Sequence, residues 1–201
     1  MAKQSLTETQ GKERAENQQF DKIIRQNMPV IFPALMEKIF GLRIIDYTPL
    51  KDKLQTTKQL EVDALHRVTD AGGNTFIIHL EVQTTNDRGM AIRLLEYRAM
   101  LNRIYGLLVR QYVLYIGAST LNMPDYIDEP ALHFTYKLID FSKLPHEWFL
   151  SSAHIEEQLL AILGDFGGKE PIKVVEEVVE AIDRQPIDRV TKINISSSCE
   201  F

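Results

Sequence analysis

The sequence predicts an α/β protein built around one mixed sheet, and three observations support that prediction. Segments with helical and strand periodicity follow one another in the order helix, strand, hairpin, helix, strand, strand and helices. A length of 201 residues suits one domain with an appendage. Apolar residues make up 44% and charged residues 25% of the chain, a balance typical of a globular protein with a sizeable core.

The first predicted element is a helix over residues 20–40. Its apolar residues recur at three- and four-residue steps, and Gly41 follows as a stop signal. Pro29 and Pro33 interrupt the pattern, so we expect a kink or two short helices. Residues 42–58 then read as a short strand followed by a polar connection.

Residues 60–68 and 75–83 are predicted to form a β-hairpin. Both segments alternate in polarity, and the sequence TDAGGN between them is rich in turn-forming residues. Even-numbered positions form an apolar face, which includes His66, and odd-numbered positions form a polar face, which includes His79. With the turn centred near Gly72, the numbers of opposed residues sum to about 144.

The remaining elements are a helix, two strands and two further helices. Residues 88–110 give the clearest helical pattern, and five arginines make this segment the basic element of the chain. Strands are predicted over residues 112–118 and 132–141, which are dense in β-branched and aromatic residues. Helices are predicted near residues 153–163 and over residues 171–183.

The hairpin register brings two carboxylates face to face. Asp63 lies across from Glu81, and Glu61 lies across from Gln83. Opposed like charges destabilise a sheet unless a cation lies between them, and Mg²⁺ is often held by one or two carboxylates. Gln83, on the same face, would orient a water molecule. The alternative is the solvated face of an amphipathic hairpin with harmless, exposed acids, and spacing alone does not decide between the two.

A longer pattern surrounds these acids. An aspartate in one strand precedes an apolar strand that ends in Glu-x-Gln, and a helix signature follows in the sequence GGNTFIIHLEVQTTNDRGMAIRLLEY, with Asp87, Met90, Arg93 and Tyr97. Over about residues 18–145 this pattern resembles the recombination-promoting nuclease/putative transposase family of bacteria. That family belongs to the PD-(D/E)xK restriction-endonuclease-like superfamily.

The resemblance implies a restriction-endonuclease-like sheet flanked by helices and a Mg²⁺-dependent deoxyribonuclease activity, with Mn²⁺ as an alternative ion. Asp63 and Glu81 would bind the metal, and Gln83 would occupy the lysine position of the superfamily motif. Glu37 is the candidate for the additional acid that the first helix often supplies. The alternative for Glu37 is an ordinary exposed helix residue.

Two departures from the superfamily pattern bear on activity. Val62 replaces the proline that names the motif, and Gln83 replaces the lysine, so positive charge must come from elsewhere or be missing. Arg93 and Tyr97, four residues apart, share one face of their helix and are expected to point toward the hairpin. Arg93 could contact a phosphate, hold Glu81, or make a structural salt bridge.

We expect four segments. They are a disordered leader, a nuclease-like domain, a C-terminal helical extension and a polar tail, over residues 1–17, 18–145, 146–183 and 184–201. The net charge is −5, with a surplus of positive charge before residue 111 and of negative charge after it, so an anion should bind the first half. No segment has the apolar length of a membrane span or a signal peptide, and Cys199 is the single cysteine, which favours the cytoplasm.

The leading hypothesis is therefore a metal-dependent DNA endonuclease linked to recombination or mobile elements, with little sequence specificity and strong salt dependence. The second is a catalytically degenerate nuclease fold that acts as a DNA-binding or protein-interaction module. The third is a dimerising α/β domain whose acids are solvated. A homodimer is compatible with double-strand cleavage, although no feature of the sequence demonstrates one.

Overall fold

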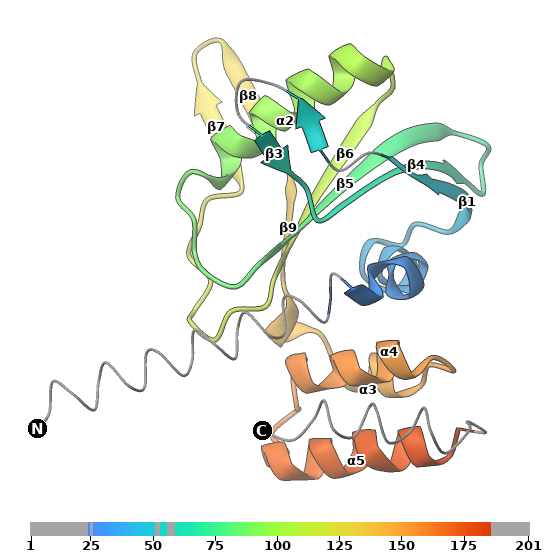
Figure 1. The fold of residues 1–201 in the computed structure, drawn as a ribbon. Helices are drawn as coiled ribbons and strands as arrows, with labels where there is room; N and C mark the ends of the chain where they lie inside the picture. Colours follow the sequence, from blue (N-terminus) through green and yellow to red (C-terminus); the bar gives the residue numbers. More distant parts are fainter. Residues whose placement is uncertain (1–23, 25, 51–52, 56–58, 186–201) are drawn as a thin grey trace, which may run out of the picture. The chain divides into compact units, whose positions relative to one another are not determined.

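Figure 1 shows the computed structural model, which divides into two compact units with the boundary between Asp140 and Phe141. The structure describes residues 24, 26–50, 53–55 and 59–185. The predicted leader and all but the first two residues of the predicted polar tail lie outside the described residues. Within the described ranges, no helix is long and apolar enough to cross a membrane.

The first unit is built on a five-stranded mixed sheet, which confirms the predicted α/β class. The strand order is β1-β4-β5-β6-β9, in which β1, β4 and β5 are antiparallel neighbours and β6 and β9 run parallel to β5. The strands span Ile44–Pro49, Ala64–Asp70, Thr75–Gln83, Val109–Tyr115 and Lys137–Asp140, respectively. The central position of β5 sets both of its faces inside the protein.

The predicted hairpin register is confirmed for β4 and β5. Ala64 pairs with Leu80 and Thr69 pairs with Thr75, so the numbers of opposed residues sum to 144. The turn is closed by Asp70, whose Oδ1 accepts hydrogen bonds from backbone amides two and four residues later, each 2.9 Å long. The carboxylate accepts hydrogen bonds in the turn in place of a backbone carbonyl, which is why Asp is common at such positions.

The predicted strand 60–68 is interrupted in the structure. Gln59–Glu61 forms β3, which pairs with β2 over Lys53–Gln55, and β4 starts only at Ala64. Glu61 therefore pairs with Lys53 and not with Gln83, which corrects the prediction made from simple alternation. The backbone at Asp63, between β3 and β4, therefore lies outside the regular strand pairing.

The first helix covers the even-numbered face of the sheet. It is continuous over residues 26–40, so the predicted alternative of two short helices divided at Pro29 and Pro33 is wrong. Gly41, at φ +63°, ends the helix, and Leu42 N–H donates back to a carbonyl six residues earlier at 2.9 Å. Phe32 stacks on His66 of β4 with ring centroids 4.2 Å apart.

Helix α2, Met90–Tyr105, covers the opposite face (Figure 1). Its buried Tyr97 meets the ring of His79 edge-on, with centroids 4.7 Å apart. From Phe76 to Val82 every side chain of β5 is buried. The odd-numbered face, predicted to be polar, is therefore not a solvated surface, because α2 lies over it.

The remaining elements of the first unit differ in length from the predictions. Helix α2 stops at Tyr105 because Gly106 adopts φ +62° there, short of the predicted residue 110. The predicted strand 132–141 is divided into β8 and β9, and β8 pairs with an unpredicted strand, β7. Strands β7 and β8 span Tyr126–Glu129 and Leu132–Thr135.

The second unit is a small helical assembly. Short turns of helix precede α5, which spans Pro171–Asp183 as predicted. The predicted helix 153–163 is instead an α-helical turn followed by a 3₁₀ segment. The described elements before α5 are η1, α3, α4 and η2, over Phe141–Lys143, Glu147–Leu150, Ile155–Gln158 and Leu159–Leu163. His146 is fully buried here, and its Nδ1 lies 2.8 Å from the carbonyl oxygen of Asp165.

Candidate active site

Asp63 lies just before β4, and Glu81 lies near the end of β5. Asp63 Oδ2 accepts a hydrogen bond of 2.7 Å from the backbone amide of Val82, the residue that follows Glu81. This bond spans the two strands and fixes the half-buried carboxylate of Asp63 beside the backbone of Glu81. The structure thus brings the side chain of Asp63 to the backbone beside Glu81, although the regular ladder begins one residue later, with Ala64 opposite Leu80.

Glu81 is a buried carboxylate with a polar partner on its own strand. The residue is 5% exposed, and its Oε1 lies 2.8 Å from Nε2 of His79. His79 is fully buried, and its Nδ1 lies 3.1 Å from Nε2 of Gln111 on β6. A buried polar side chain is costly unless it is hydrogen-bonded, and His79 supplies that bond to Glu81.

The carboxylates of Asp63 and Glu81 act on a common neighbour, Tyr97 of α2. Burial raises the pKa of the Tyr97 phenol to about 12, and the negative charges of Glu81 and Asp63 act in the same direction. Arg93 opposes this shift in pKa. Tyr97 therefore stays a neutral hydroxyl even well above physiological pH.

Gln83 marks the end of β5, where two loops are tied together. Its carbonyl accepts a 2.8 Å hydrogen bond from Ile116, and its side chain is half-buried. Asn86, in the loop after β5, accepts from the amide of Asn122 at 2.7 Å and donates to the carbonyl of Thr120 at 2.9 Å. These bonds hold the loops that leave β5 and β6 in one arrangement.

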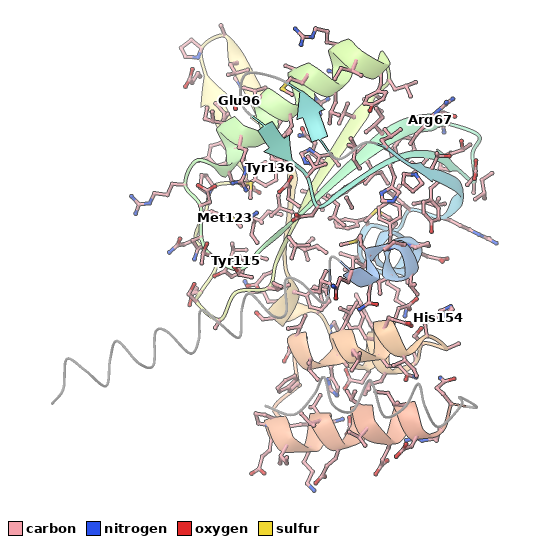
Figure 2. All side chains as sticks on the ribbon, viewed as in Figure 1. Arg67, Glu96, Tyr115, Met123, Tyr136 and His154 are labelled. Atoms are coloured by element: carbon pink, nitrogen blue, oxygen red, sulfur yellow. The ribbon has the colours of Figure 1, made fainter. Side chains whose placement is uncertain are left out.

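Close contact reinforces this junction. A Cβ at Gly117 would lie 2.2 Å from the carbonyl oxygen of Thr84, so only glycine fits between the two loops. Tyr115, at the end of β6, donates a 2.8 Å hydrogen bond to the carbonyl of Ser119. Figure 2 labels Tyr115 and, farther along the same side of the unit, Met123, which is 5% exposed.

The remaining predicted residues occupy different surroundings. Arg93 makes a 3.0 Å ion pair with Asp87 and is one-third exposed, so it holds the start of α2 and not Glu81. Glu37 is exposed on the first helix, which lies over the opposite face from α2. The structure thus does not bring Glu37 onto the face that carries Glu81.

The donor set suits a hard divalent cation. Carboxylate oxygens are the ligands that Mg²⁺ prefers, and it usually takes one or two of them along with water and phosphate. Asp63 and Glu81 supply such a pair. Across the described ranges, no three or more His, Cys, Asp and Glu side chains are grouped so as to hold a metal ion. Within the described ranges, a metal ion at Asp63 and Glu81 would therefore need further ligands such as water or phosphate.

Two residues behind Glu81, His79 and Gln111, are not among the predicted catalytic or metal-binding residues. His79 carried a detectable signal, because it lies two residues before Glu81 and so shares its face of β5. Gln111 carried none, because its contact with His79 depends on the parallel pairing of β5 with β6, which joins positions 32 residues apart.

Comparison with known proteins gives partial structural overlaps only. No protein-family model matches the chain, and neither does any curated protein. A repair endonuclease from Pyrococcus abyssi aligns with 44% of this chain and 38% of its own, at a TM-score of 0.28 and 19% identity. An EndoMS–dsDNA complex aligns with 44% of this chain and 35% of its own, at a TM-score of 0.27 and 22% identity. The chain thus spans little more than a third of either neighbour.

Proposed function

We propose that the protein is a metal-dependent DNA endonuclease linked to recombination or mobile elements. The observation that carries the proposal is the 2.7 Å bond from Val82 N–H to Asp63, since it holds one acid beside the residue that follows the other acid, Glu81. Together with the sequence pattern through Gln83 and α2, this pair supports hydrolysis of a phosphodiester. The family link itself rests on the sequence resemblance.

In this proposal Asp63 and Glu81 hold Mg²⁺, or Mn²⁺ in its place. The metal supplies Lewis acidity and lowers the pKa of an attacking water. Gln83, at the rim of the strand, positions that water through its side-chain amide. Tyr97, a neutral phenol at physiological pH, adds no third negative charge to the pair.

DNA contact is expected at the end of the sheet where β5 finishes. Arg88 is exposed in the loop between Gln83 and the start of α2, whereas Arg98 donates to the carbonyl of Val109 at 3.0 Å. Arg103 is also exposed but lies at the far end of α2, roughly 20 Å away at 1.5 Å per residue. Arg88 is thus the favoured phosphate contact, and Arg103 is its matched control.

The central test is plasmid nicking at low salt with Mg²⁺, comparing the parent with Asp63→Asn and Glu81→Gln. Both substitutions preserve shape and remove charge, and nicking should fall at least 100-fold in each, the scale of losing a group that acts in the transition state. Glu96→Gln, at an exposed position on α2, is the matched control and should nick normally. Full nicking activity in both site variants would contradict the proposal.

DNA binding offers a second test, which does not require cleavage. Arg88→Ala should weaken binding for all sequences alike and reduce the dependence on salt by about one phosphate contact. Arg103→Ala should leave binding unchanged. Equal effects of the two variants, or binding that ignores salt, would contradict the placement of DNA at this end of α2.

The second candidate is a catalytically degenerate nuclease fold that binds DNA or protein. Gln83 favours it, because an amide cannot supply the positive charge of the lysine in the superfamily motif. Parent protein that binds DNA but neither Mg²⁺ nor Mn²⁺, and never nicks, would establish this reading. Gln83→Lys then asks whether one restored charge recovers cleavage.

A further inference from the structure

We propose that Gln111 and His79 form a buried relay that orients the carboxylate of Glu81, so that His79 is a positioning residue for the metal site. The inference deepens the proposed function and rests on it. Three contacts carry it: Gln111 Nε2 to the carbonyl of Leu94 at 2.7 Å, Gln111 Nε2 to His79 Nδ1 at 3.1 Å, and His79 Nε2 to Glu81 Oε1 at 2.8 Å.

Donor counting assigns the proton on the imidazole. The carbonyl of Leu94 can only accept, so the nitrogen of the Gln111 amide must face it. That same nitrogen carries a second hydrogen, which it donates to His79 Nδ1. Nδ1 is thereby the acceptor, the ring proton resides on Nε2, and Nε2–H donates to Glu81 Oε1.

Burial keeps each member of the relay in place. His79 is fully buried, and Glu81 and Gln111 are each 5% exposed. Tyr97 of α2 meets the His79 ring edge-on at 4.7 Å and blocks its rotation. Gln111 is also tied to the backbone of α2 through Leu94, so the relay joins β5, β6 and α2.

The relay leaves one buried polar atom unpaired, and good packing alone would not require this. Gln111 Oε1 is buried without a hydrogen-bond partner among the described residues. An apolar pair at positions 79 and 111 would fill the same space and leave no orphaned acceptor. The benefit lies at Glu81, where one oxygen is held by His79 and the carboxylate plane is fixed for a metal ligand.

The tautomer can be measured on the metal-free protein. Long-range proton–nitrogen spectra of the ¹⁵N-labelled full chain should report a protonated Nε2 and a bare Nδ1 for His79. A protonated Nδ1 with a bare Nε2 would overturn the relay, because Glu81 would then face a lone pair. This readout does not depend on catalysis or on metal.

Two amide substitutions separate orientation from packing. The amide nitrogen of His79→Gln can reach the place of Nε2 and still donate to Glu81, whereas that of His79→Asn reaches only the place of Nδ1. Removing a group that orients a metal ligand typically weakens metal affinity 10–100-fold. In calorimetric Mn²⁺ titrations we therefore expect His79→Asn to lose at least 10-fold in affinity and His79→Gln to stay within about 3-fold of the parent.

The same titrations distinguish the two proposals. Parent protein that binds Mn²⁺, with equal losses in His79→Asn and His79→Gln, overturns the relay and leaves the metal site standing. Parent protein that binds no Mn²⁺ overturns the metal site and, with it, the role of His79 in orienting a ligand. Thermal unfolding without metal checks that both variants fold. An equal fall in the metal-free melting temperature of the two variants would show that they lose the same packing.

Discussion

The stability of the first unit should depend on pH through His66, which lies beneath the first helix. Its side chain is 5% exposed, its Nδ1 has no hydrogen-bond partner among the described residues, and its ring stacks on Phe32. Burial lowers the pKa of His66 from 6.5 to about 4, because the charged form would lose its hydration there. The perturbation is His66→Phe, which keeps an aromatic ring against Phe32 and removes the titrating group.

The sign and size follow from linkage. Because the pKa of His66 is depressed in the folded state, the unfolded chain binds a proton at higher pH than the folded protein does. The neutral ring thus stabilises the fold fully above pH 6.5, and this contribution is lost as the pH falls from 6.5 toward 4. A change in pKa of this size corresponds to about 3 kcal/mol.

Urea unfolding at pH 7, 6, 5 and 4.5 provides the assay. The carboxylates titrate in the parent and in His66→Phe alike, so the difference between the two isolates the histidine. The parent should lose about 2–3 kcal/mol more of its free energy of unfolding across this range than His66→Phe does. Parallel loss in the two proteins would refute the assignment of His66 as a buried neutral base.

Two further predictions concern the junction of the loops after β5 and β6. Gly117→Ala should destabilise the protein by about 1–3 kcal/mol in urea unfolding, because its Cβ would fall 2.2 Å from the carbonyl oxygen of Thr84; a neutral result would mean that the loops separate at no cost. Asn86→Ala should cost about 1–2 kcal/mol through the loss of its bonds to Thr120 and Asn122, while Asn102→Ala, exposed on α2, should cost almost nothing in the same assay; equal costs would remove Asn86 as the tie between the loops.

Local signals were sufficient for much of the fold. Alternation and the turn sequence predicted the β4–β5 register, since a slip of one residue would have moved the apolar set to the wrong face. The apolar repeat of α5 predicted its bounds at Pro171 and Asp183. Predictions failed where a long-range contact overrides local preference, as in the helix that continues through Pro33 against the sheet.

The same distinction between local signals and long-range contacts holds for the candidate site. The sequence by itself determined the register of the β4–β5 hairpin, and with it the nearness of Asp63 to the strand that carries Glu81, because the register of one hairpin is a local property. Only the tertiary structure decided that Glu81 is buried, that His79 and Gln111 stand behind it, and that Glu37 lies on the other face. These features depend on which helix covers which face and on the parallel pairing of β5 with β6, and both depend on contacts between residues far apart in the chain.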